Sequence, residues 1–207
     1  NFLTYVNYDK DKVTSLDISN NKVLSSFDCS NGVLTNLNVT NMVALKELNC
    51  SYNKLSVLNL SGTVGILTLN SSANNLTNLD LSLNTALNEL NTSQNKLKNL
   101  ALNNNLNLKN LNCSNNDISI LDISENSNLN YVDCSSNKLL NLDVTKNLLL
   151  EHLYSSNNKL ENIDVTKNIS LKELVCSDNN INNINLNNTI LTNLSASGNA
   201  LLNIDIK

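Results

Sequence analysis

The chain has little of what most catalytic and binding surfaces are made from. Its 207 residues include no proline, no tryptophan, four glycines and one histidine, and aromatic residues make up only 3%. Hydrophobic residues nevertheless reach 41%, which is enough for an ordinary core. Because aromatics are so rare, leucine, isoleucine and valine must supply nearly all of that core.

Charge and hydropathy exclude two further classes of protein. The net charge is −4, so no basic stripe is present to neutralise phosphates, and we expect no nucleic-acid partner. No apolar run approaches the ~20 residues that a helix needs to cross a membrane, so we expect no membrane-spanning segment.

The residue types that catalysis requires are equally scarce. His152 is the one histidine, and the chain has no glycine-rich phosphate loop. Asp122, Asp143 and Asp164 recur at a fixed interval, which we interpret as a solvated row on the outer face that discourages edge association. We therefore expect no enzymatic activity, no cofactor and no metal site.

Aliphatic residues at a fixed interval divide the chain into repeats. Steps of 21 residues separate the first nine starts, and a step of 20 leads to a tenth repeat that is unfinished at residue 207. Self-similarity at such a period is typical of stacked supersecondary units. We predict one repeat domain over residues 1–207, with starts at Leu3, Leu24, Leu45, Ile66, Leu87, Leu108, Leu129, Leu150, Leu171 and Leu191.

The repeat reads L-x-x-L-x-C-S-x-N-x-L-x-x-L-D-V-S-x-N-x-x, as in LNYVDCSSNKLLNLDVTKNLL from Leu129 to Leu149. Its first eleven positions match the leucine-rich-repeat segment L-x-x-L-x-L-x-x-N-x-L, with cysteine or a small residue at the sixth position. The chain therefore resembles the leucine-rich-repeat family over nearly its whole length. The short repeat and its asparagine, serine and leucine content are most similar to bacterial surface or secreted members, broadly the internalin-like ones.

Each repeat also contains two similar halves. In each half apolar residues stand two apart, as Val132 with Cys134 and Leu142 with Val144, which is the period of an extended strand. No stretch keeps a helical period. We predict a right-handed, curved leucine-rich-repeat solenoid of about ten turns with little or no helix. A parallel sheet is expected on its concave side, and short strands or irregular extended chain on its convex side.

Polar residues recur in columns as well. The resemblance implies that asparagines at the ninth position bond the backbone of adjacent turns at a corner, where backbone groups need partners. We expect a second asparagine column to do the same at the other corner, and the seventh-position serines to bond local backbone groups. The first asparagine column is Asn53, Asn74, Asn95, Asn116, Asn137, Asn158, Asn179 and Asn199, and the second is Asn84, Asn105, Asn126, Asn147 and Asn168.

All five cysteines stand at the sixth, inward-facing position. Other turns have small residues there, such as Ser71, Thr92 and Ala196, so we interpret cysteine as a small buried filler. The odd count argues against a disulfide framework, and zinc would need ligands that converge. The cysteines are Cys29, Cys50, Cys113, Cys134 and Cys176.

The concave sheet is the expected binding surface, because members of this family commonly bind partners there. We expect the second, third, fifth, seventh and eighth positions of each turn to face solvent. Most are polar, but aromatic residues gather at the third and fifth positions of neighbouring turns. Tyrosine offers large rigid area and a hydroxyl, which is typical of interface anchors. The predicted partner-binding patch is Tyr131, Asp133, His152, Tyr154, Glu173 and Val175.

Asparagine glycosylation signals on the expected binding surface favour a bacterial source over a eukaryotic secretory one. Modifying Asn49, Asn70, Asn91 and Asn112, which stand in such signals, would coat the concave sheet. The favoured hypothesis is a bacterial surface or secreted module that binds a host or matrix protein by its concave sheet. A structural spacer in a larger surface protein and a polysaccharide-binding module are the alternatives, and an enzyme is the least favoured.

Overall fold

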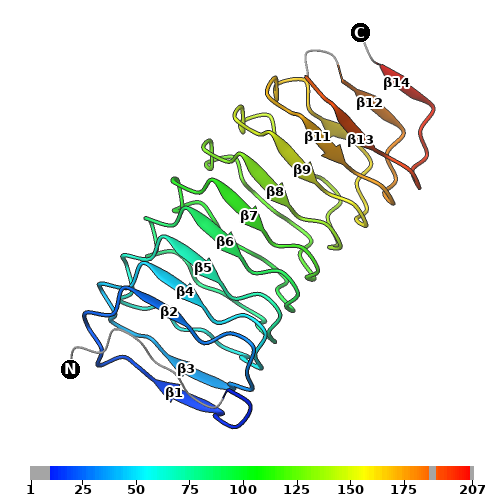
Figure 1. Ribbon diagram of the computed structural model, residues 1–207. Coiled ribbons are helices and arrows are strands. Elements are labelled where there is room, and N and C mark those ends of the chain that lie inside the picture. The colour runs from blue at the N-terminus through cyan, green and yellow to red at the C-terminus, as the bar shows by residue number, and fades with distance from the viewer. Residues whose placement is uncertain (1–9, 187–189, 206–207) are drawn as a thin grey trace.

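The computed structural model describes residues 10–186 and 190–205 and shows, in these residues, a solenoid of stacked turns without helices (Figure 1). The first predicted repeat start, Leu3, lies outside the described residues. One short strand per turn joins a nine-stranded parallel sheet, here called the long sheet. Its strands are, in spatial order, β2 (Ser26–Asp28), β4 (Glu47–Asn49), β5 (Thr68–Asn70), β6 (Glu89–Asn91), β7 (Asn110–Asn112), β8 (Tyr131–Asp133), β9 (His152–Tyr154), β11 (Glu173–Val175) and β13 (Asn193–Ser195).

The register of the long sheet follows the period of the sequence. Ser26 pairs with Glu47 and Glu47 with Thr68, so equivalent letters of successive repeats lie side by side. At the far end Glu173 pairs with Asn193, which is the 20-residue step read from the sequence. The solenoid therefore has about nine turns in the described residues, against the ten predicted, because the first predicted start is outside them.

The opposite layer is extended but only partly regular, as the sequence predicts. Strands form near the two ends and irregular extended chain runs between them (Figure 1). Among the described residues no helix occurs, and none is long and apolar enough to cross a membrane. The strands of this layer are β1 (Ser15–Asp17), β3 (Asn36–Asn38), β10 (Ile163–Asp164), β12 (Asn183–Asn185) and β14 (Asn203–Asp205).

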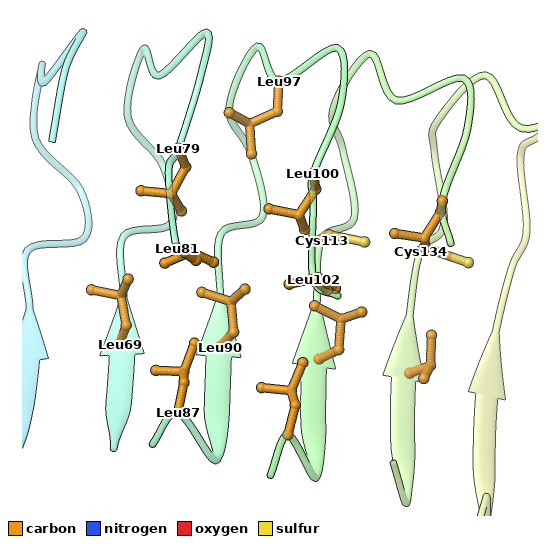
Figure 2. Packing of buried hydrophobic residues seen from close by; sticks show 14 of the residues in the cluster. Leu69, Leu79, Leu81, Leu87, Leu90, Leu97, Leu100, Leu102, Cys113 and Cys134 are labelled. Atoms are coloured by element: carbon orange, nitrogen blue, oxygen red, sulfur yellow. The ribbon is translucent and has the colours of Figure 1, made fainter. Parts of the chain in front are cut away.

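One continuous aliphatic core fills the space between the layers. Figure 2 shows Leu69 and Leu90 pointing inward from the long sheet, and Leu79 and Leu100 from the opposite layer. Cys113 and Cys134 lie stacked in successive turns of this core, and none of the five cysteines, each 0% exposed, forms a disulfide. A single turn cannot bury these residues by itself, so the stacking of turns stabilises each of them.

Both asparagine columns bond the corner backbone, as predicted. Asn95 shows the first: its Oδ1 accepts a 2.9 Å bond from the backbone N–H of Leu76, one turn back. Its Nδ2 donates to the carbonyls of Ser71, Thr92 and Ser93 at 3.0 to 3.2 Å. In the second column Asn126 Nδ2 donates to carbonyls of the preceding turn at 2.9 and 3.0 Å. These buried amides join each turn to its neighbour.

The eighth position of every described turn of the long sheet adopts left-handed backbone geometry. Ala73 has φ 51° and Gln94 has φ 55°, although a Cβ disfavours this region. The backbone N–H of Ala73 donates a 2.9 Å bond to Ser93 of the next turn, so the stacked hydrogen bonds hold the conformation. Only Gly198 brings a glycine to the column, so the sequence carries no glycine signal for it.

The seventh-position serines differ from expectation in two ways. They are largely buried, with Ser51 3% and Ser72 5% exposed, so they do not face solvent as predicted. Their hydroxyls also find a side-chain partner in place of the backbone: Ser72 Oγ donates to Asn70 Oδ1 at 2.7 Å. The same bond recurs in neighbouring turns at Ser51, Ser93 and Ser114.

Candidate functional site

The register brings the six predicted site residues together on three neighbouring strands. Tyr131 on β8 pairs with His152 on β9, and His152 pairs with Glu173 on β11. All six residues are half-buried, and on each strand they flank a central residue that is fully buried. We call the set Tyr131, Asp133, His152, Tyr154, Glu173 and Val175 the aromatic–acidic patch.

Three rings form the centre of the patch. The centroid of Tyr131 lies 5.4 Å from that of Tyr154, with the planes tilted by 42°. The His152 ring lies 6.3 Å from Tyr131 at a tilt of 40°. These distances are within the range of favourable aromatic pairs. The rings therefore restrict each other on the sheet surface.

Glu173 is the polar centre of the patch. Its Oε2 accepts a hydrogen bond from the phenolic Oη of Tyr154 and lies 3.3 Å from His152 Nδ1. Its Oε1 accepts a 2.6 Å bond from Asn193 Nδ2 on β13. Asn193 was not among the predicted site residues, although it stands at the third position of the next turn, directly after Glu173 in that column. One carboxylate thus orients side chains from both neighbouring strands.

These contacts shift the pKa of the groups involved. The hydrogen bond from Tyr154, and then the one from His152, holds the pKa of Glu173 below its usual value. The same bond to Glu173 raises the pKa of Tyr154 to about 12. Burial, followed by the charges of Asp133 and Glu173, raises the pKa of Tyr131. At neutral pH the patch therefore presents protonated phenols beside an ionised carboxylate.

Asp133 and Val175 form the edges of the patch and take no part in this network. Asp133 Oδ1 accepts a 3.0 Å bond from the backbone N–H of Ser135, so its carboxylate is held by its own turn. Val175 pairs with Tyr154 in register and adds an aliphatic surface. The patch thus combines a central ring cluster with an acidic and an aliphatic border.

A row of exposed aliphatic side chains was not predicted. It runs at the twentieth position of the turn, where Leu106, Leu148 and Ile169 directly follow buried asparagines of the second column; Leu106 is 51% and Ile169 61% exposed. The signal for the row was the recurrence of an aliphatic residue at the twentieth position of the repeat. The row is Val43, Val64, Leu106, Leu148, Ile169 and Ile190.

The remaining reactive side chains are held in structural positions. Burial raises the pKa of Cys29 and Cys113 to about 12, so these thiols stay protonated at neutral pH. Asp143 Oδ1 accepts bonds from both the backbone N–H and the hydroxyl of Thr145, and these bonds lower its pKa. Within residues 10–186 and 190–205, no group of three or more metal-ligating side chains lies together.

Comparison with known proteins gives fold neighbours and one closer likeness. No protein-family model matches the chain, and no curated protein matches it. The functional domain of InlJ from Listeria monocytogenes, described as including a cysteine ladder, is 36% identical with a TM-score of 0.72. The alignment covers 89% of this chain and 46% of that one.

Two further solved structures share the fold at lower identity. YopM from Yersinia enterocolitica WA-314 is 24% identical, with a TM-score of 0.79 over 90% of this chain and 40% of that one. Internalin C2 from Listeria monocytogenes is 22% identical, with a TM-score of 0.71 over 83% and 81%. The chain spans less than half the length of the InlJ and YopM structures. The stacked 21-residue turns and these likenesses show that the chain belongs to the leucine-rich-repeat proteins and is similar to internalins of Listeria.

Proposed function

We propose that the chain is a non-enzymatic protein-binding module of a bacterial cell-surface or secreted protein, and that it binds a host or matrix protein through the aromatic–acidic patch. The bacterial surface assignment is supported by the likeness to Listeria proteins, at 36% identity for InlJ. The binding assignment is supported by the placement of Tyr131 and Tyr154 in ring contact on an open sheet.

The network around Glu173 favours binding because it lowers the entropy lost when a partner docks. Tyr154 is held by its hydrogen bond to Glu173 and by the ring of Tyr131, so its side chain is already ordered. Binding that orders a free side chain costs about 0.5–1.5 kcal/mol per residue, and this patch avoids part of that cost. Tyrosines held in this way are typical of interface hot spots.

Truncation of the two tyrosines tests the proposal. Tyr131→Ala and Tyr154→Ala are each expected to weaken binding to fibronectin, laminin or a collagen about 30-fold, since a hot-spot residue contributes about 2 kcal/mol. Binding is measured by biolayer interferometry, and thermal unfolding confirms that each variant remains folded.

Tyr52→Ala is the matched control. Tyr52 is 55% exposed and stands at the eighth position on an earlier turn, where the next turn already has Ala73 in the same backbone geometry. Its truncation is expected to leave binding unchanged. Equal losses in all three variants would place the site elsewhere. A wild-type chain that binds none of the matrix proteins and retains nothing from a host-cell surface extract would favour the structural spacer.

A further inference from the structure

The fifth position of the long sheet contains a run of asparagines whose amides all point the same way. Asn70 pairs in register with Asn91, and Asn91 with Asn112. Each Oδ1 accepts two hydrogen bonds from the serine two residues on. For Asn91 these are 2.8 Å from Ser93 Oγ and 3.1 Å from the backbone N–H of Ser93. Because a backbone N–H only donates, the atom facing it must be the amide oxygen, and the NH2 group points the other way.

Three NH2 groups of this run make no hydrogen bond to the part of the chain that the structure describes. Asn49, at the N-terminal end of the column, donates its Nδ2 to Asp28 Oδ2 at 3.0 Å. In the described structure no hydrogen bond is made by Nδ2 of the next three asparagines, although each is half-buried. Neighbouring strands lie ~4.8 Å apart, so the three groups form a row of oriented donors at about that spacing. We call Asn70, Asn91 and Asn112 the amide row.

The amide row lies in a shallow trough that ends at an aromatic ring. The trough is also lined by Thr68, Glu89 and Asn110, the third-position residues of the same strands, and by Tyr131, the third-position residue of β8. Both rings that Tyr131 contacts belong to β9. The side of Tyr131 toward β7 makes no ring contact and borders the trough. The trough thus offers donors along its length, a carboxylate acceptor at Glu89 and a stacking surface at one end.

The spacing of the donors selects the kind of ligand. A matching ligand is extended, runs along the solenoid axis and presents an acceptor at each ~4.8 Å step. An extended peptide presents carbonyls to one side only at every second residue, or ~6.6 Å, and falls out of phase with the row. An extended β-linked hexose chain has oxygen acceptors on every sugar and repeats at nearly the strand spacing.

Charge selects among polysaccharides. The trough contains Glu89, Asp133 lies at its aromatic end, and the chain has a net charge of −4. An anionic polymer would be repelled, whereas a neutral one donates its hydroxyls to these carboxylates. Sugar rings also stack on tyrosine faces, which Tyr131 provides.

We propose that the amide row binds a neutral, extended, β-linked polysaccharide along the solenoid axis, with one sugar stacked on Tyr131. This site shares Tyr131 with the aromatic–acidic patch but does not include His152, Tyr154 or Glu173, and it adds a second ligand class to the protein-binding function proposed above. The amide row supplies the hydrogen bonds, and the buried serines keep its donors oriented without a ligand.

Conversion of asparagine to aspartate tests the amide row with little risk to the fold. Asn91→Asp with Asn112→Asp removes both NH2 groups and keeps the oxygen that the serines need. Aspartates already occupy this column, where Asp28 Oδ1 accepts a 2.8 Å bond from Ser30 and Asp133 Oδ1 a 3.0 Å bond from Ser135.

The matched control is Asn38→Asp with Asn59→Asp, on the opposite layer. It adds the same charge at a column where aspartate is also accommodated: Ser61 N–H donates to Asn59 Oδ1 at 2.9 Å, as Ser82 N–H does to Asp80 Oδ1. The measurement is native gel electrophoresis through hydroxyethylcellulose, repeated by calorimetry with the hexamer of N-acetylglucosamine.

The wild-type chain and the control are expected to bind at least one of these two probes, and the Asn91/Asn112 variant to bind it at least tenfold more weakly. The proposal is overturned if the wild type binds neither probe, or if the Asn91/Asn112 variant binds as well as the control. Tyr154→Ala separates the two proposals, because Tyr154 does not line the trough. That variant is expected to lose protein binding and keep polysaccharide binding, so either proposal can fail alone.

Discussion

Tyr154 on β9 donates its phenolic proton to Oε2 of Glu173, which lies 19 residues further along the chain on the neighbouring strand β11. The bond stabilises the protonated phenol and the ionised carboxylate together. The bond should therefore be lost at high pH, where the phenol ionises, and at low pH, where the carboxylate becomes protonated.

Removing the charge of Glu173 should make the phenol of Tyr154 easier to ionise. Glu173→Gln is expected to lower the pKa of Tyr154 from about 12 toward its usual 10.0, because the hydrogen bond to Glu173 is the largest cause of the shift. The measurement is the ultraviolet absorbance of tyrosinate during an alkaline titration. Glu89→Gln, on the same face of the sheet, is the control and should leave the titration unchanged.

The same bond predicts a pH window for stability. The raised pKa of Tyr154 means that its contribution is present below pH 10.0 and is lost as pH rises toward 12. The lowered pKa of Glu173 means that the contribution is present above pH 4.5 and is lost as pH falls below it. The stability difference between wild type and Glu173→Gln should therefore be largest between these limits. A difference that does not change with pH would show that the bond is not formed in solution.

The buried asparagine ladder should be a major source of stability. Asn95→Ala leaves the N–H of Leu76 and nearby carbonyls without their partner. Each unsatisfied buried group costs about 1–3 kcal/mol, so we expect a loss of about 3 kcal/mol in the free energy of unfolding by urea. Asn99→Ala, at an exposed position, should change it by less than about 0.5 kcal/mol. Similar losses in both would contradict a stabilising ladder.

The left-handed column predicts that glycine is tolerated where alanine now stands. Ala73 has φ 51°, which costs a residue with a Cβ about 1–2 kcal/mol. The greater flexibility of glycine in the unfolded chain costs about 0.4–1 kcal/mol, so Ala73→Gly should leave stability unchanged or raise it.

Ala101→Gly is the matched comparison, because Ala101 is exposed and does not have a positive φ. There the flexibility of glycine has no compensation, and we expect a loss of about 0.4–1 kcal/mol. The two variants should differ by about 1 kcal/mol in chemical unfolding. If Ala73→Gly is the more destabilising of the two, the left-handed geometry is not a cost to the native chain.

Period alone was enough to predict which residues become neighbours. Tyr131, His152 and Glu173 stand 21 residues apart, and the strand register places them side by side. The inward columns were predicted for the same reason, since in turns of fixed length the same repeat position always lies on the same face of the solenoid. The buried cysteines and both asparagine ladders follow from this rule.

Side-chain direction did not follow from period. The seventh-position serines were expected on the surface, yet Ser72 turns inward to hold Asn70, because its hydroxyl and N–H both find the same amide oxygen. The left-handed column had no glycine pattern to reveal it, since the hydrogen bonds between turns impose that geometry on asparagine, tyrosine, alanine and glutamine alike.

The amino-acid sequence by itself determined the solenoid, the length of its turn, its core columns and the strands on which the candidate site residues lie, because a strict 21-residue period fixes which letters stack. Only the tertiary structure decided that Glu173 links Tyr154, His152 and Asn193, and that the amide row leaves its donors free. Those outcomes depend on which rotamer each side chain adopts, and the rotamer is set by hydrogen-bond partners that adjacent turns provide.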